Sequence, residues 1–231
     1  MNKTNPQLFK LSPSDFKYLY EDCKHCYYQK VKNNISLPSI GMPGVFSKMN
    51  SLLQNAIIGM DLREINSKLP AGKIEVKEGF LKSKPIPPGN DCFISGRFDI
   101  ATRLDDGTYS VIDFKITDPK EDKISKFFSQ LHAYKFALEN PTFGEAKKVS
   151  KMGVIAINPD EISFPNDNVI FKAKAHWFEI KEDMDRFYAF ISEVSVLLNG
   201  PVPPENSENC RWCFYRICTK ESNKFKNDLP F

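Results

Sequence analysis

The sequence predicts an α/β domain in which helices flank a short mixed sheet. Five segments have the composition and alternation of strands: 73–82, 93–104, 108–117, 149–158 and 169–180. Four segments carry apolar residues at helical spacing and lie before, between and after these strands: 12–27, 45–59, 120–139 and 182–198. A chain of 231 residues, 41% of them hydrophobic, is long enough to bury a core between such layers.

The predicted strands have an expected order in the sheet. The turn Asp105-Asp106-Gly107 is a strong hairpin signal between the second and third strands. We expect the first three strands to pair as a meander and the strand at 149–158 to join after the helix at 120–139 has crossed over. The domain is predicted to span residues 11–220, with a flexible arm at 1–10 and a tail at 221–231.

Charge and hydropathy restrict the class of protein. The net charge of +3 permits an anionic partner but does not require one. No run of about 18 apolar residues is present, so no transmembrane helix is predicted. The first residues lack the apolar core of a signal peptide. We therefore expect a cytoplasmic protein with no membrane partner, in which the six cysteines are reduced.

Three polar residues on the two strands of the hairpin predict a metal site. Asp113 and Lys115 share one face of the strand, because side chains two residues apart on a strand point the same way. Asp99, on the neighbouring strand, is expected to lie close to them. Two carboxylates beside a lysine suit Mg²⁺ or Mn²⁺ and a phosphate, since these ions take oxygen ligands and activate water. The alternative is an ordinary solvated strand face.

Five of the six cysteines fall in two short segments. Near the C-terminus they have the spacing Cys210-x2-Cys213-x4-Cys218. Three such thiolates need a fourth ligand to complete a tetrahedral zinc site or a four-cysteine cluster, and Cys23 or Cys26 can supply it. Such a site would join the two ends of the domain. The alternative is a set of reduced, partly buried cysteines without a ligand.

These motifs together resemble the PD-(D/E)XK nuclease superfamily, in its RecB-like exonuclease branch. The closest likeness is to iron–sulfur nucleases, such as CRISPR-associated exonucleases and the nuclease domains of AddAB-type helicase–nucleases. The residues that carry the resemblance are Gly96-Arg97-Phe98-Asp99, Asp113-Phe114-Lys115 and Gln130-x3-Tyr134, followed by the three C-terminal cysteines. The resemblance covers about residues 11–220. It implies a restriction-endonuclease-like core with N- and C-terminal segments joined at the cysteine site.

The resemblance also implies roles for particular residues. The metal, Mg²⁺ or Mn²⁺, would be held by Asp99, Asp113 and the backbone carbonyl of Phe114. Lys115 would position or activate the attacking water. Gln130 and Tyr134 would orient the site and the DNA strand; the alternative is that Tyr134 belongs to a core stripe and Gln130 is only its polar neighbour.

A 4Fe–4S cluster is the second implied cofactor, with a structural Zn²⁺ as the alternative. Its expected ligands are Cys23, Cys210, Cys213 and Cys218, with Cys26 as the alternative to Cys23. Four further residues are predicted to contact DNA by charge or stacking: Lys48, Arg211, Trp212 and Arg216. A helicase or another DNA-processing protein is an expected partner.

One position departs from the family pattern. Related nucleases carry a histidine as a further metal ligand a few residues after a glycine, on the helix before the sheet. Here Gly44 is followed by Val-Phe-Ser-Lys-Met-Asn, and the three histidines, His25, His132 and His176, all lie elsewhere.

The leading prediction is a metal-dependent deoxyribonuclease that acts as an exonuclease on single-stranded DNA ends. A non-catalytic DNA-binding or assembly subunit that keeps the fold and the cluster is the first alternative, and the missing histidine favours it. A zinc-bound interaction module with an accidental Asp-x-Lys is the second.

Overall fold

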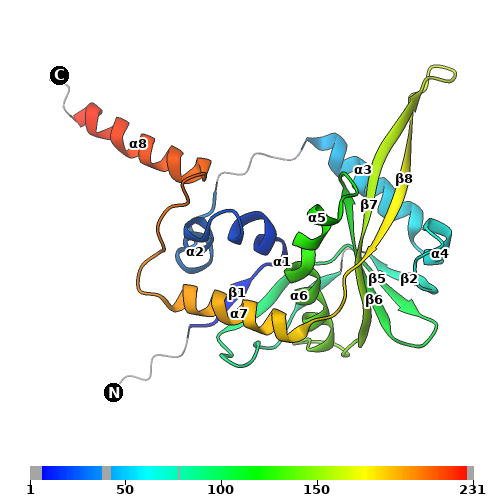
Figure 1. Ribbon diagram of the computed structural model, residues 1–231, viewed down its shortest axis with the longest axis horizontal. Helices are drawn as coiled ribbons and strands as arrows, with labels where there is room; N and C mark the ends of the chain where they lie inside the picture. The colour runs from blue at the N-terminus through cyan, green and yellow to red at the C-terminus, as the bar shows by residue number, and fades with distance from the viewer. Residues whose placement is uncertain (1–6, 38–42, 78, 228–231) are drawn as a thin grey trace.

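Two sheets carry the fold of the computed structural model, which describes residues 7–37, 43–77 and 79–227 (Figure 1). The strands are Phe9–Leu11 (β1), Gly72–Lys77 (β2), Phe80–Lys82 (β3), Cys92–Arg97 (β4), Ile100–Leu104 (β5), Tyr109–Ile116 (β6), Val149–Ser163 (β7) and Ile170–Glu179 (β8). The helices are Pro13–Asp15 (α1), Phe16–Tyr20 (η1, a π-helical turn), Lys24–Asn33 (α2), Gly44–Ile57 (α3), Leu62–Ile65 (α4), Glu121–Ile124 (α5), Ser125–Phe127 (η2, a 3₁₀ turn), Phe128–Glu139 (α6), Met184–Asn199 (α7) and Arg211–Asn227 (α8).

The five-stranded sheet has the order β2-β5-β6-β7-β8, with β6 at its centre. β6 pairs antiparallel with β5, as the hairpin signal predicts, and parallel with β7. A parallel neighbour requires a crossover, since the chain must return to the same end of the sheet, and the helical segment that ends in α6 provides it. The predicted mixed sheet with flanking helices is confirmed.

Helices cover both faces of this sheet (Figure 1). On one face, α6 and α7 share a buried cluster with β6, which includes Val111, Leu131 and Phe187. On the opposite face, Ile57 at the end of α3 packs in a second cluster that includes Ile112. Because β6 is buried from both sides, a charged side chain on it is shielded from water, and this position determines the properties of the site described below.

The predicted strand at 93–104 is divided in two. Its first half, β4, belongs to the small sheet β1-β4-β3, and its second half, β5, belongs to the large one. The break falls at Phe98 and Asp99. Gly96, just before it, lies so close to the start of the first helix that an added Cβ would be 2.9 Å from Cδ of Pro13. The predicted strand at 73–82 is likewise divided into β2 and β3, which lie in different sheets.

The N-terminal region differs most from the predictions. Residues 9 and 10, which we assigned to a flexible arm, belong to β1, which pairs in parallel with β4; residues 1–6 of that arm lie outside the described residues. The predicted helix at 12–27 is interrupted. Its continuation, α2, begins afresh after Cys23, whose backbone is extended (φ −160°, ψ 103°) and whose sulfur accepts a hydrogen bond from the Cys26 N–H at the helix start.

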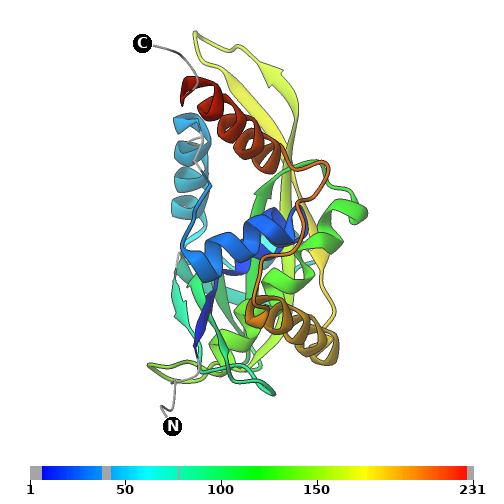
Figure 2. The same cartoon turned by 90° about the vertical axis from the view of Figure 1, so that its left-hand side faces the viewer.

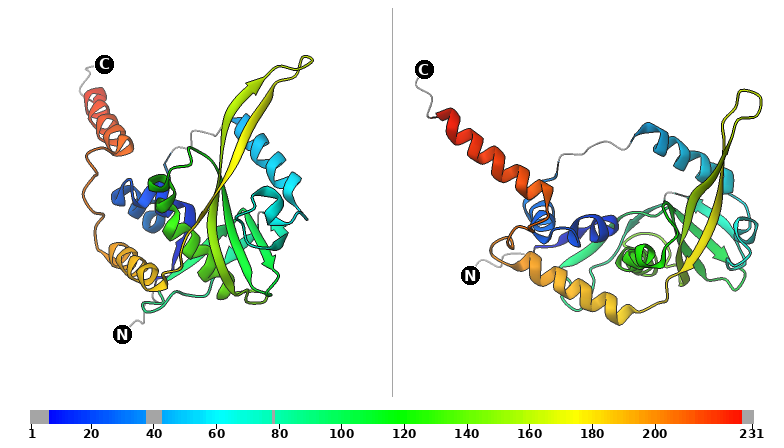
Figure 3. Two further views of the ribbon diagram at one scale, coloured as in Figure 1. Left: turned by 45° about the vertical axis from the view of Figure 1, so that its right-hand side comes forward. Right: turned by 45° about the horizontal axis from the view of Figure 1, so that its top comes forward.

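The later elements agree with the predictions, except at the C-terminus. The helices at 45–59 and 182–198 correspond to α3 and α7, and the segment at 120–139 contains α5, η2 and α6. Helix α8 was not predicted. Figures 2 and 3 show the β7–β8 hairpin extending beyond the rest of the sheet. None of the helices in the described part of the chain combines the length and the apolar character needed to cross a membrane.

Candidate nuclease site and cysteine centre

Strand β6 brings Asp113 and Lys115 together on the face that α6 covers. The Asp113 carboxylate is only 1% exposed, and its Oδ2 lies 2.6 Å from Nζ of Lys115. The strand period of two explains this pairing, as expected from the sequence. A buried carboxylate beside a lysine is costly unless its remaining oxygen also has a partner, and α6 supplies that partner.

Helix α6 contributes two polar side chains that lie one turn apart. Nε2 of Gln130 donates to Oδ1 of Asp113 at 3.1 Å and lies 2.9 Å from the hydroxyl oxygen of Tyr134. Both side chains are buried. Gln130 thus contacts Asp113 directly, while Tyr134 belongs to the buried core cluster, as the alternative interpretation of that residue expects. Within the described residues, Oε1 of Gln130 is buried without a hydrogen-bond partner, so it can accept from a ligand or water in the site.

Asp99 reaches the site from the break between β4 and β5. Its Oδ2 accepts a hydrogen bond from the backbone N–H of Phe114 at 2.9 Å. This contact fixes Asp99 beside the residue that lies between Asp113 and Lys115 in the sequence. The structure therefore brings together the three residues that the hairpin pattern singled out.

Burial and charge determine the ionisation of the pair on β6. Burial raises the pKa of Asp113 to about 7; the negative charge of Asp99 acts in the same direction, and Lys115 opposes both. For Lys115, burial alone would lower the pKa, but the attraction of Asp113 and Asp99 outweighs it and the pKa is raised. Burial also raises the pKa of Tyr134, which keeps its hydroxyl protonated at neutral pH.

A cleft of about 730 Å³ opens onto these residues. Asp99, Phe114 and Lys115 form part of its wall. The rest of the wall includes residues that sequence reasoning did not single out for the site: Tyr18 of η1 and Phe46, Ser47, Asn50 and Ser51 of α3. For the α3 residues, the sequence offered one clue: the helix after Gly44 carries polar and aromatic side chains that are not needed for a core.

The donor atoms at this cleft fit a hard divalent cation. In its wall, Asp99 offers a carboxylate and Phe114 a backbone carbonyl. Asp113 and Gln130 are not part of the lining: the Asp113 carboxylate lies buried against Lys115, and the unpartnered Oε1 of Gln130, beside Asp113, can bind a water of the ion. Mg²⁺ and Mn²⁺ prefer oxygen ligands and commonly retain several waters, so two carboxylates suffice. Lys48, in contrast, is exposed on α3 and is not among the residues that line the cleft.

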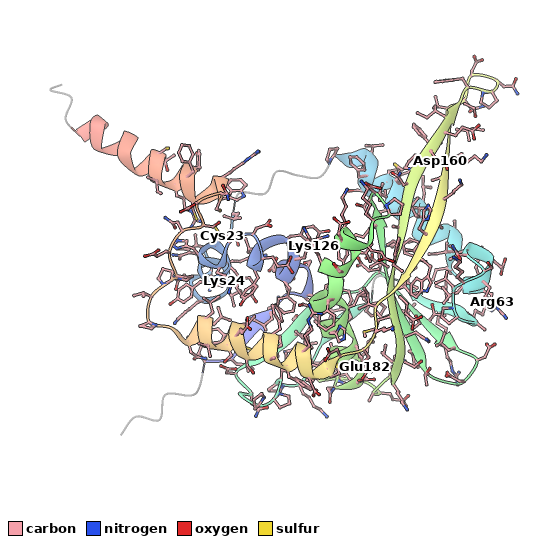
Figure 4. All side chains as sticks on the ribbon, viewed as in Figure 1. Cys23, Lys24, Arg63, Lys126, Asp160 and Glu182 are labelled. Atoms are coloured by element: carbon pink, nitrogen blue, oxygen red, sulfur yellow. The ribbon has the colours of Figure 1, made fainter. Side chains whose placement is uncertain are left out.

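Four cysteine sulfurs form a second candidate centre, and none of these cysteines is among the residues that line the cleft. The atoms belong to Cys23, Cys26, Cys210 and Cys213, and all lie within 4.8 Å of one another. The Sγ of Cys26 is 3.6 Å from those of Cys210 and Cys213. Figure 4 marks Cys23 where α2 meets the start of α8. The expected junction of the N- and C-terminal segments is thus present, and its thiols fit either a zinc ion or an iron–sulfur cluster.

The membership of this group differs from the predicted ligand set. Cys26, which we treated as an alternative to Cys23, lies in the group together with it. Cys218 is exposed and lies outside the group. The reason is local: Cys23 caps α2 and Cys26 lies in its first turn, so both sulfurs face Cys213, whereas Cys218 lies five residues further along α8.

The sulfurs have different tendencies to ionise. Burial opposes ionisation of Cys23, but the N–H groups of Cys26 and Ser207 donate to its sulfur and lower its pKa to about 7. Burial raises the pKa of Cys213 to about 11 and also raises that of Cys26. Arg216 donates from Nη2 to the Sγ of Cys26 at 2.8 Å.

The three residues near the C-terminus that are predicted to contact DNA differ in how exposed and how engaged their side chains are. Arg216 is engaged with Cys26, and Trp212 is partly buried against the core. Arg211 is exposed. His132, one of the three histidines of the chain, is buried, and its ring has a partner on each side: the N–H of Asp183 donates to Nε2, and Nδ1 donates to the carbonyl of Phe128.

Comparison with known proteins identifies the family. The model of the PD-(D/E)XK nuclease superfamily matches residues 44–218, which include Asp99, Asp113, Lys115 and Gln130. The chain belongs to the PD-(D/E)XK nuclease superfamily. Members of this superfamily are typically metal-dependent nucleases, and DNA is the substrate that such a domain implies.

Two further comparisons add little to this assignment. Among solved structures, the chain is similar to one titled "Crystal structure of SSO0001", with a TM-score of 0.42 and 14% sequence identity, over 90% of this chain and 84% of that chain. A search of curated proteins finds no match.

Proposed function

We propose that the chain is a Mg²⁺- or Mn²⁺-dependent deoxyribonuclease that removes nucleotides from single-stranded DNA ends. The observation that carries the proposal is the convergence of Asp99, Asp113 and Lys115: Asp99 and Lys115 line one open cleft, and the buried Asp113 carboxylate contacts Lys115. Stability alone does not explain a buried lysine–carboxylate pair on a central strand, because two apolar side chains would be at least as stable there.

The chemistry divides between the cation and the side chains. A bound divalent cation would supply a water of lowered pKa and neutralise charge that develops on the phosphorus. Asp99 and Asp113, with the Phe114 carbonyl, would hold it. Lys115 would orient the attacking water or bind a phosphate oxygen, while Gln130 holds the Asp113 carboxylate in place and is itself held by Tyr134.

Substitution of Asp113 tests this proposal. We expect Asp113→Asn to lose cleavage of end-labelled single-stranded DNA in Mn²⁺, because the amide cannot replace an anionic ligand. Asp160→Asn is the matched control, since Asp160 lies on the β7–β8 hairpin away from the cleft (Figure 4), and it should cleave at the parental rate. Cleavage that survives Asp113→Asn would contradict the assigned site.

A second candidate function is a non-catalytic DNA-binding or assembly subunit. The absence of a histidine after Gly44 favours it, since that helix presents to the cleft only neutral hydroxyl and amide groups, from Ser47, Asn50 and Ser51. A protein that binds single-stranded DNA but fails to cleave it in Mg²⁺ or Mn²⁺ would support this candidate against the nuclease.

The cysteine centre is proposed to bind a 4Fe–4S cluster that joins the two ends of the domain. The resemblance to iron–sulfur nucleases supports the cluster. The 3.6 Å sulfur separations instead favour one Zn²⁺, because thiolates about 2.3 Å from a tetrahedral ion lie about 3.8 Å apart. Measured iron, zinc and sulfide contents, with absorbance near about 400 nm for the cluster, decide between them.

Location and partners follow from the same reasoning. Reduced thiols are needed for either metal centre, which fits the cytoplasm. A helicase that generates single-stranded ends would be a suitable partner.

Binding of DNA by Lys48, Arg211 and Trp212 also belongs to this proposal. Substitution of each by alanine should weaken DNA binding if the residue contributes.

A further inference from the structure

Two aromatic side chains stand exposed in the wall of the cleft that holds Asp99 and Lys115. Tyr18 is 53% exposed and comes from η1; Phe46 is 42% exposed and comes from α3. These segments belong to the helical layers on different faces of the sheet (Figure 1). Exposed rings lose the free energy that burial would provide, so two of them at one charged cleft suggest a ligand with flat apolar faces.

Tyr18 is held at the cleft by a buried neighbour. Its ring packs edge-on against Phe127, with centroids 6.4 Å apart and an interplanar angle of 67°. Phe127 is buried, and its ring also lies 5.4 Å from Nζ of Lys115. The π-helical turn η1 carries Tyr18, and such turns occur often at functional sites. Tyr18 is therefore fixed relative to Lys115 through a shared contact rather than free to turn away.

Lys17, the residue before Tyr18, brings a second ammonium group to the Phe127 ring that Lys115 also approaches, although Lys17 itself is not among the residues that line the cleft. Its Nζ lies 3.4 Å from the centroid of Phe127. Among the described residues, no carboxylate forms an ion pair with it. Burial lowers the pKa of Lys17, and the neighbouring charges of Lys115 and Lys126 lower it further, against the opposing effect of Glu21 and Asp113. Figure 4 marks Lys126 beside this segment. An anion bound here would offset the repulsion between these ammonium groups.

We propose that Tyr18 and Phe46 stack on unpaired bases of a DNA strand in the cleft, while Lys17 binds a phosphate next to the one that Lys115 meets. The inference rests on the proposed function and names the residues that would hold its single-stranded substrate. A ring can stack on a base only where the base is unpaired and unstacked from its neighbours. The site therefore takes single strands or frayed ends of a duplex. Aromatic rings accept any base, so no sequence preference is expected.

Binding of two oligonucleotides tests the inference without cleavage. One is an oligothymidylate of about twelve nucleotides; the other has the same phosphates but abasic sugars. In the non-cleaving Asp113→Asn background, we expect the thymidylate to bind at least about tenfold more tightly, since each stacked base contributes measurably. Tyr18→Ala and Phe46→Ala should each reduce this ratio while leaving affinity for the abasic strand unchanged. Tyr18→Trp should preserve the ratio.

Two controls separate stacking from charge and from general surface effects. Phe214→Ala removes an exposed ring on α8, away from the cleft lining, and should change neither affinity. Lys17→Gln should weaken both oligonucleotides by a similar factor and reduce the salt dependence by about one counterion. Because Tyr18, Phe46 and Phe214 are all exposed, the variants should fold, which circular dichroism checks.

Several outcomes would overturn the inference. They are equal affinity of the Asp113→Asn protein for the two oligonucleotides, failure of that protein to bind either, and an equal loss of both affinities when Tyr18→Ala or Phe46→Ala is added to it. Failure of the proposed function looks different: the protein would discriminate the two strands through Tyr18 and Phe46 yet cleave neither in any divalent metal. Cleavage that is unaffected by either substitution, without discrimination, would retain the nuclease and reject the stacking site.

Discussion

Gln130 on α6 donates a hydrogen bond to the Asp113 carboxylate on β6, and the donor nitrogen lies 3.1 Å from the acceptor oxygen. Thus a helix that crosses between two parallel strands also holds the buried carboxylate of the central strand. The same Nε2 lies 2.9 Å from the hydroxyl of Tyr134, one turn further along. The helix therefore couples the formation of the sheet to the orientation of the proposed metal ligand.

Loss of Gln130 should weaken the site without unfolding the protein. We expect Gln130→Ala to reduce kcat/KM for DNA cleavage and Mn²⁺ affinity by about 10- to 100-fold, because residues that orient metal ligands have effects of this size. Tyr134→Phe removes only the hydroxyl beside Gln130 and should have a smaller effect on both quantities. Mn²⁺ titration and steady-state kinetics measure them. An unchanged Mn²⁺ affinity in Gln130→Ala would show that the contact does not support a metal ligand.

Metal binding should depend on pH through Asp113. Its pKa is raised to about 7, mainly by burial, and the cation requires the ionised carboxylate. At subsaturating Mn²⁺, the cleavage rate should therefore increase with pH and reach half its plateau near pH 7. Higher Mn²⁺ concentrations should move this midpoint to lower pH, since metal competes with the proton. A midpoint that does not move with Mn²⁺ concentration would contradict this.

The same raised pKa has an effect on stability with a defined sign. The ordinary value is 3.8, so between that pH and about 7 the folded, metal-free protein holds a proton that the unfolded chain has released. The contribution of Asp113 to the free energy of unfolding should decrease as pH rises through this window. Urea titrations of the parent and of Asp113→Asn should differ in this slope, with the variant showing the shallower decrease.

Cysteine substitution should show which thiols bind the metal centre. The structure predicts that Cys26→Ser loses most of the bound iron or zinc and lowers the melting temperature, because its sulfur lies within 3.6 Å of two other members of the group. Cys218→Ser is the matched control on α8 and should keep the metal. Elemental analysis of the two purified proteins measures the result. Loss from Cys218→Ser with retention by Cys26→Ser would instead favour the ligand set that the sequence resemblance implies.

Local patterns in the sequence predicted the main sheet and the three central polar residues. The period of two placed Asp113 beside Lys115, and the Asp-Asp-Gly turn placed β5 beside β6. Both relationships act over a few residues, so a single sequence contains them. The contact between Gln130 and Asp113 was reached only through the family resemblance, because it depends on how α6 packs on the sheet.

Tertiary contacts explain where the structure differs from the predictions. The strand at 93–104 breaks because β4 pairs with β1, a strand some 80 positions earlier, which composition cannot reveal. The sequence favours Cys23 over Cys26 because it does not show that α2 begins directly after Cys23, which brings both sulfurs to Cys213. Tyr18 matched no motif, and only its packing against Phe127 brings it to the cleft.

Cleavage of end-labelled single-stranded DNA by the parent and by Lys115→Ala, in Mn²⁺ and under anaerobic conditions, tests the central claim most directly. Lys172→Ala, on the distant β7–β8 hairpin, is the matched control. We predict that the parent and Lys172→Ala cleave and that Lys115→Ala retains at most about a hundredth of the activity, a loss of about 2.7 kcal/mol or more in transition-state stabilisation. Equal cleavage by all three proteins, or by none in either Mg²⁺ or Mn²⁺, would contradict the assignment of a nuclease site to Asp99, Asp113 and Lys115.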